Sequence, residues 1–79
     1  MPTKVKVCIN TIDAVKEFCN ITARQDFDID IVSSRYIVDA KSIMGMFSID
    51  LTRDVEIHIH ETEENCKDFL EAIKKFVVN

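Results

Sequence analysis

The sequence predicts an α/β (α+β) fold: a two-layer open-faced sandwich in the order β-α-β-β-α-β-α. Three stretches alternate apolar and polar residues with a period of two, and the short apolar run Tyr36–Val38 is expected to pair with one of them as a hairpin. Each predicted strand is expected to have one apolar face. Other stretches repeat apolar residues at helical spacing. One-sided strands suit a four-stranded antiparallel sheet covered on one face by three helices. With 79 residues, the chain has the length of one domain, so residues 1–79 are expected to form a single domain.

The first half of the sequence predicts a strand, a helix and a hairpin. In chain order these are a strand containing Val5, Val7 and Ile9, a helix from about Ile12 to Ala23, and hairpin strands Phe27–Val32 and Tyr36–Val38 joined by a turn at Ser33–Arg35. Asn10 or Thr11 could cap the helix, and Asp13 would favour its positive N-terminal end.

The second half predicts a short helix, a strand and a long final helix. Ser42 is the expected N-cap of the short helix, and Thr62 is the expected N-cap of the final one. The strand contains Val55, Ile57 and Ile59 alternating with Glu56, His58 and His60, and the final helix has an apolar stripe at Cys66, Phe69, Leu70, Ile73, Phe76 and Val77.

Composition narrows the classes of function. The net charge is −4 and the pI about 5.0, which argues against nucleic acid and against an anionic membrane surface as partners. No apolar run approaches the length of a membrane span and no signal peptide is evident, so a cytoplasmic location without membrane insertion is expected. Three cysteines without a CxxC motif are expected to be free thiols, and no cofactor is expected. The expected state is a monomer or a weak dimer.

The segment Lys41–Gly45 carries a more specific indication, because it reads K-S-I-M-G. This segment resembles the HPr family, the histidine-containing phosphocarriers of the phosphoenolpyruvate-dependent sugar phosphotransferase system. The element order fits the same family, so the resemblance covers most of the chain. It implies an HPr-like sandwich in which the strands lie in the order first, fourth, second, third.

The resemblance also indicates that the chain lacks the family's phosphate-carrying histidine motif. In the family, a histidine in a G-[IL]-H-A-R-P motif after the first strand receives phosphate and passes it to sugar permease components. The corresponding stretch here is Ile9–Ala14, where an ungapped alignment places Thr11 at the histidine position and Asp13 at the arginine position. Aligning the first strands instead suggests that the loop has lost residues. Either way the sequence predicts a degenerate phosphocarrier that has no catalytic residue and is not an enzyme.

Two features of the K-S-I-M-G region have both a functional and a structural interpretation. Ser42 corresponds to a serine that a dedicated kinase phosphorylates in part of the family, so it is a candidate regulatory site; the alternative is that it only caps its helix. The apolar residues that follow are a candidate partner-binding surface, and the alternative is that most belong to the core; they are Ile43, Met44, Met46 and Phe47. The partners would be proteins, either phosphotransferase-system components or a serine kinase.

A histidine pair supplies an alternative function. His58 and His60 are expected on one face of the fourth strand, where an H-x-H pair can bind zinc or copper with Cys8 as a third ligand. The plainer interpretation is a solvated polar face without a metal. A further alternative is a structural interaction domain unrelated to sugar transport.

Overall fold

The computed structural model describes residues 3–33 and 36–78 of the chain. Its elements are β1 (Thr3–Val7), α1 (Ile12–Thr22), β2 (Ile29–Ser33), β3 (Tyr36–Asp39), α2 (Ile43–Phe47), β4 (Val55–Ile59), α3 (Lys67–Ala72) and the 3₁₀ helix η1 (Lys74–Phe76). Residues 34 and 35 of the predicted hairpin turn lie outside the described part. No helix in the described part is long and apolar enough to cross a membrane.

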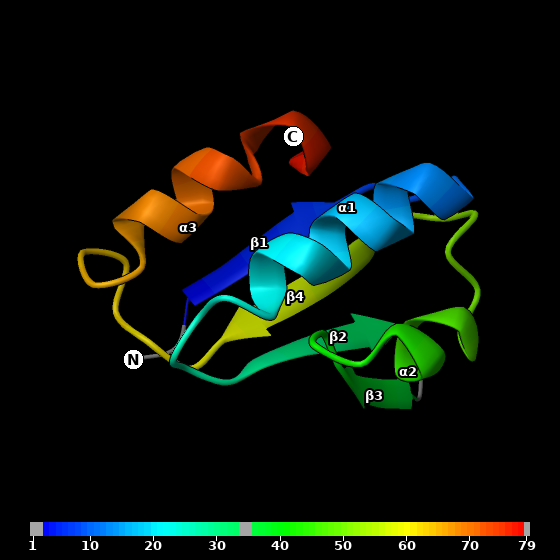
Figure 1. Cartoon of the computed structure of the whole chain (residues 1–79), viewed down its shortest axis with the longest axis horizontal. Helices are drawn as coiled ribbons and strands as arrows, with labels where there is room; N and C mark the ends of the chain where they lie inside the picture. Colours follow the sequence, from blue (N-terminus) through cyan, green and yellow to red (C-terminus); the bar gives the residue numbers. More distant parts are fainter. Residues whose placement is uncertain (1–2, 34–35, 79) are drawn as a thin grey trace.

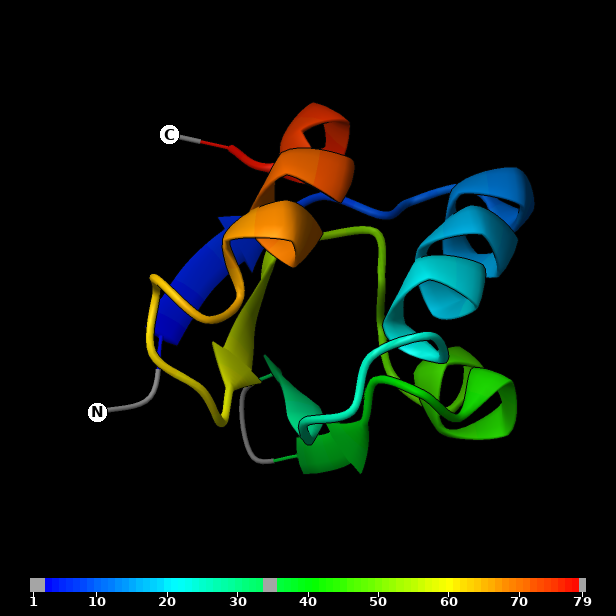
Figure 2. The same cartoon turned by 60° about the vertical axis from the view of Figure 1, so that its left-hand side comes forward.

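The four strands form one sheet in the order β1-β4-β2-β3, and all neighbours are antiparallel. The helices lie together on one face of this sheet, with α1 and α3 above β1 and β4 and with α2 beside β3 (Figures 1 and 2). The expected open-faced sandwich and its strand order are therefore confirmed.

The core lies between the sheet and the helices, because every second strand residue faces that way. Ile29, Ile31, Ile57 and Ile59 are fully buried on the helix-facing side. Aromatic side chains pack against one another in pairs: Phe18 of α1 meets the ring of Phe76 of η1 edge-on at 5.5 Å between centroids, and Phe27 meets the ring of Phe69 of α3 at 5.8 Å. Edge-to-face contacts of this kind stabilise beyond the area they bury.

The final helix is shorter than the sequence predicts. Thr62 does accept a hydrogen bond from the backbone N–H of Asn65, but this closes a separate turn, and α3 begins only at Lys67. The helix ends at Ala72, and after η1 the backbone becomes extended at Val77, which forms an antiparallel bridge with Val7. The predicted stripe is nevertheless buried at Cys66, Phe69, Ile73 and Phe76. The last residues leave helical geometry because they pair with the edge of β1.

The other predicted boundaries shift by one or two residues. α1 ends at Thr22, with Ala23 as its C-cap. β1 ends at Val7, although Ile9 is buried as expected, and β2 begins at Ile29, two residues after Phe27.

Thr22 connects α1 to the segment that precedes α2. Its side chain is fully buried, and its hydroxyl lies 2.7 Å from the carbonyl oxygen of Ala40 and 3.0 Å from that of Cys19.

We expect Thr22→Val to lower the free energy of unfolding by about 1–3 kcal/mol, because the buried Ala40 carbonyl would lose its donor. Urea denaturation measures this, with Thr62→Val at an exposed turn as the control. Equal losses in the two variants would contradict the assigned role.

Candidate functional site

The N-terminus of α1 is closed by a threonine and carries an acidic first turn. The Thr11 hydroxyl accepts a hydrogen bond from the Ala14 N–H at 3.0 Å, so Thr11 is the N-cap. Asp13 follows in the first turn. The sequence contains two histidines, His58 and His60, and the structure places them on β4 and directly after it. The α1 N-terminus therefore contains no imidazole nucleophile, and no base within hydrogen-bond distance activates Thr11 among the described residues.

The K-S-I-M-G segment forms the start of α2 and is hydrogen-bonded to the segment that follows α1. The Ser42 hydroxyl accepts a hydrogen bond from the Gly45 N–H at 3.1 Å, which confirms the predicted N-cap. The Lys41 ammonium donates to the Gln25 carbonyl at 2.7 Å. A Cβ at Gly45 would lie 3.4 Å from Ser42 Oγ and 3.5 Å from Val38 Cβ. These are ordinary van der Waals distances, so the packing of α2 against its cap and against β3 does not require glycine at this position.

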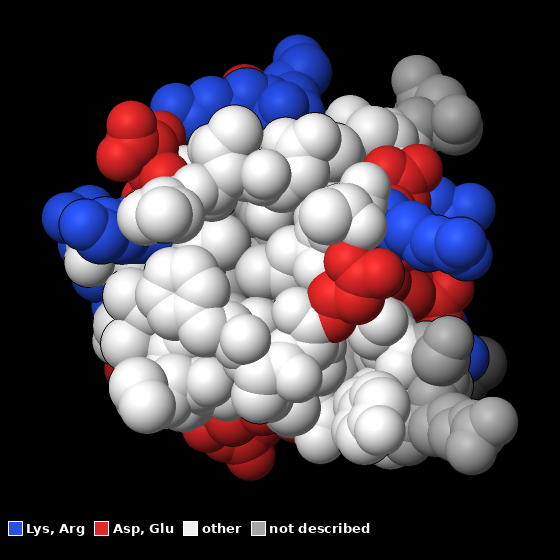
Figure 3. Space-filling model, turned by 90° about the vertical axis from the view of Figure 1, so that its right-hand side faces the viewer, with Lys and Arg blue, Asp and Glu red and all other residues white. Residues whose placement is uncertain are grey.

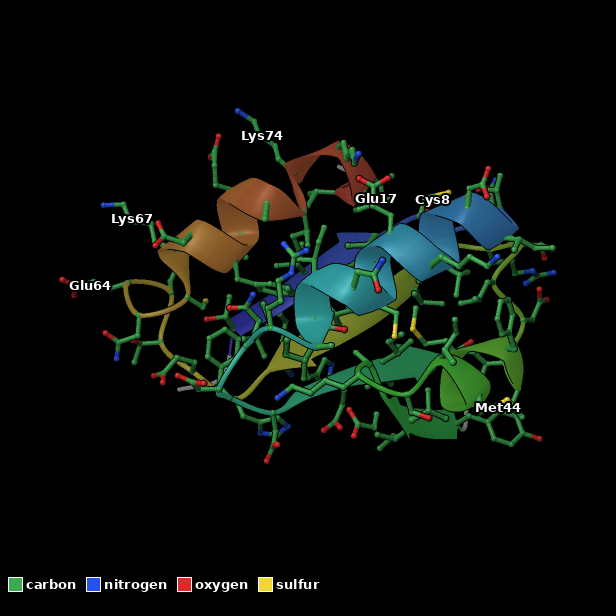
Figure 4. The ribbon with its side chains drawn as sticks, viewed as in Figure 1. Cys8, Glu17, Met44, Glu64, Lys67 and Lys74 are labelled. Atoms are coloured by element: carbon green, nitrogen blue, oxygen red, sulfur yellow. The ribbon has the colours of Figure 1, made fainter. Side chains whose placement is uncertain are left out.

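Three of the four predicted contact residues are exposed, and the fourth is not. Met44 is 78% exposed and projects from the outer side of α2 (Figure 4). Phe47 is 48% and Ile43 37% exposed. Met46 is fully buried. It therefore belongs to the core, because the inward face of a one-turn helix must pack on the sheet, and it is removed from the predicted contact surface.

Ile12 extends this apolar area across to α1. It is 64% exposed at the start of that helix. A shallow pocket of about 160 Å³ lies between the start of α1 and the segment after α2; it is lined by Ile9, Asn10, Thr11, Ile12, Val15, Phe47, Ile49, Leu51 and Thr52. We call Ile12, Ile43, Met44 and Phe47 the α1–α2 surface. Figure 3 shows this end of the molecule, with a broad uncharged area and charged side chains around it.

The sequence did not single out Ile12, because its position fits the apolar stripe of a helix that packs on a core. A first-turn residue of a capped helix can project past the end of the core, and only the fold reveals this. The pocket likewise joins residues that are far apart in the chain.

The histidines lie on the open side of the sheet, each beside a carboxylate. Nε2 of His60 is 2.7 Å from Oδ2 of Asp30, and Nε2 of His58 is 2.6 Å from Oε1 of Glu56. The hydrogen bond from His58 holds the pKa of Glu56 below its ordinary value.

Cys8 does not join the histidines as a third metal ligand. Lys4 pairs with His58 across the strands, and Cys8 lies four residues farther along, roughly 13 Å away at strand spacing. Figure 4 shows Cys8 near the start of α1. Within residues 3–33 and 36–78, no three His, Cys, Asp or Glu side chains are grouped to hold a metal ion.

The lowered pKa of Glu56 predicts how stability depends on pH. A carboxyl group with a depressed folded-state pKa stabilises the fold above its ordinary value near 4.5, and this contribution disappears as the pH falls through the folded-state pKa. We therefore expect Glu56→Gln to be less stable than the parent at pH 7, and we expect this difference in stability to be smaller near pH 3. Urea titrations at both pH values measure the difference. A difference that is the same at both pH values would contradict the assigned hydrogen bond between His58 and Glu56.

Comparison with known proteins identifies the family. The PTS-HPr family, described as "PTS HPr component phosphorylation site", matches residues 12–79, so the match begins after Thr11. The fold is similar to HPr-C-His from Thermoanaerobacter tengcongensis, with a TM-score of 0.74, 19% identity, and coverage of 92% of this chain and 88% of that one. It is also similar to the phosphocarrier protein HPr from Bacillus anthracis str. Ames, with a TM-score of 0.70, 25% identity, and coverage of 99% and 96%. No curated protein matches the sequence. The chain belongs to the HPr family of the phosphotransferase system.

Proposed function

We propose that this HPr-family chain binds protein partners of the sugar phosphotransferase system and regulates them, without carrying phosphate on a histidine and without acting as an enzyme. The proposal rests on the residues found at the N-terminus of α1. A capping threonine and an acidic first turn stand there, and both histidines lie elsewhere in the fold.

The negative charge in the first turn of α1 supports the proposed loss of phosphate transfer. A helix N-terminus attracts a phosphoryl group through its free N–H groups and its dipole. Here the Thr11 side chain already accepts from the Ala14 N–H, and the Asp13 carboxylate adds negative charge in the same turn. Like charges at this spacing repel, so the site opposes an incoming phosphoryl group.

The α1–α2 surface supports partner binding. Four large apolar side chains are exposed from two neighbouring elements, and methionine among them can adapt to different partners. Ser42 lies half-buried at the start of α2, directly before Ile43 and Met44. A phosphate on Ser42 would add a charge of about −2 beside this surface, so phosphorylation would change which partners can dock.

The regulatory part of the proposal is tested with the serine kinase that acts on HPr proteins. We expect phosphate on Ser42, detected by mass spectrometry, and no phosphorylation of Ser42→Ala. Ser48→Ala is the matched control, because Ser48 lies at the other end of α2 and its hydroxyl donates to the Gly45 carbonyl. Absence of phosphate on Ser42, or equal labelling of both variants, would contradict the regulatory role.

A further inference from the structure

The two edges of the sheet differ in how they are covered. At β1 the C-terminal segment runs along the edge: the Val78 N–H donates to the Lys6 carbonyl at 2.9 Å, and the Cys8 N–H donates to the Phe76 carbonyl at 2.8 Å. At the other edge β3 pairs with β2 on its inner side. None of the described residues pairs with its outer side. An uncovered strand edge is a template for another strand.

The hydrogen-bond pattern shows which backbone groups of β3 face outward. The Ala40 N–H donates to the Ile29 carbonyl at 2.8 Å, and bonded pairs alternate along an antiparallel ladder. Val38 therefore directs its N–H and C=O toward Ile31, its partner on β2, and Ile37 directs both groups away from the sheet. Asp39 also faces outward, but its carbonyl accepts from the Ser42 N–H at 3.0 Å. Ile37 is thus the centre of the available edge.

The side chains of β3 suit pairing with another strand. Ile37 is 68% exposed and Tyr36 63% exposed. Natural edge strands are usually protected by charged side chains, proline or a bulge. β3 has no lysine or proline, and its one charged residue, Asp39, is at its end. β-branched and aromatic residues are instead the types that strands favour. Ile37 lies opposite Val32 on the open face of the sheet, and Tyr36 and Val38 are on the opposite face.

We propose that β3 pairs antiparallel with β3 of a second copy of this chain, about a two-fold axis at Ile37, so that two sheets join into one. The strand is complementary to itself in this register. Ile37 offers one outward donor and one outward acceptor, so each copy donates to and accepts from the other. Ile37 then lies against Ile37 of the second copy, and Tyr36 lies opposite Val38 of the second copy, an aromatic and β-branched pairing that stabilises sheets. This association is independent of the proposed phosphotransferase partners.

Charge and size make the association weak. Each copy carries a net charge of −4, so the copies repel at low salt. The strand has four residues, which gives a small interface. We expect a dissociation constant of roughly 10–1000 µM, at the weak end for specific complexes, and tighter association as salt screens the repulsion.

Sedimentation equilibrium over increasing protein concentration, together with two matched variants, tests the proposal. Ile37→Lys is expected to weaken dimerisation by at least about tenfold, because it places like charges at the two-fold axis. Ile12→Lys makes the same chemical change at a similarly exposed isoleucine, 64% against 68%, and alters the net charge equally. It should dimerise like the parent. Thermal melting checks that both variants are folded.

A backbone measurement separates strand pairing from other modes of association. The Ile37 amide hydrogen should exchange more slowly as the protein concentration rises, and Ile37→Pro, which removes that outward donor at an edge position, should be monomeric. A parent that remains monomeric at about 1 mM would overturn the proposal. A dimer that persists in Ile37→Lys, or an Ile37 amide whose exchange ignores concentration, would do the same.

Discussion

Phe18→Ala is expected to unfold the protein or bring it to the edge of unfolding. The ring is fully buried under α1 and meets the Phe76 ring edge-on at 5.5 Å. Replacing a buried phenylalanine by alanine costs about 3–5 kcal/mol in lost burial and a residual cavity. Small domains have about 5 kcal/mol of stability, near the low end of the usual range. The melting temperature should therefore fall by more than about 10 °C, which circular dichroism measures.

Phe47→Ala is the matched control for this result. It makes the same chemical change at a ring that is 48% exposed, so the expected loss is about 1 kcal/mol or less. If Phe47→Ala destabilised the fold as much as Phe18→Ala, the division between the core and the α1–α2 surface would be wrong.

The second large effect is expected at Met44, on binding and not on stability. Met44 is the most exposed member of the α1–α2 surface at 78%, so Met44→Asp should leave the melting temperature almost unchanged. If the side chain anchors a partner, the variant should lose at least about 2 kcal/mol of binding free energy, roughly 30-fold in affinity. Isothermal titration of the phosphoenolpyruvate-dependent enzyme that phosphorylates HPr proteins measures this.

Ile37→Asp provides the control for the binding experiment. It also replaces an exposed apolar residue by aspartate, but on β3 and away from the α1–α2 surface. At protein concentrations below those at which dimers form, it should bind like the parent. Unchanged affinity in Met44→Asp, with binding by the parent intact, would contradict the assignment of the partner surface.

The elements whose identity depends on local pattern were predictable from the sequence. Period-two alternation located three of the four strands, and the apolar run Tyr36–Val38 located the fourth as a hairpin partner. Ser42 caps the helix that its position predicted, and Thr11 is the cap of the two candidates Asn10 and Thr11. The predicted extent of the final helix was wrong, because its apolar stripe continues from helical residues into an extended segment. Phe76 remains buried at helical spacing, whereas Val77 pairs with Val7, a residue seventy positions earlier in the chain. No local pattern contains that long-range pairing.

The candidate site was predictable only in part, for a similar reason. The sequence indicates that Ile43, Met44, Met46 and Phe47 cannot all face inward, but a five-residue helix does not tell which one does. The fold selects Met46 for the core and adds Ile12 from α1. Tyr36 and Ile37 are exposed on β3, which is an edge strand because of the sheet order. No local pattern contains that order, and only the family resemblance implied it.

Direct phosphate transfer tests whether this HPr-family chain has lost histidine phosphorylation. The protein is incubated with phosphoenolpyruvate and the enzyme that phosphorylates HPr proteins, beside an HPr that retains the active-site histidine. Acid-labile phosphate is then located by mass spectrometry. We predict label on the comparison HPr and none on this chain, because the α1 N-terminus carries Thr11 and Asp13 and both histidines lie elsewhere in the fold. Phosphohistidine at His58 or His60 would contradict the claim.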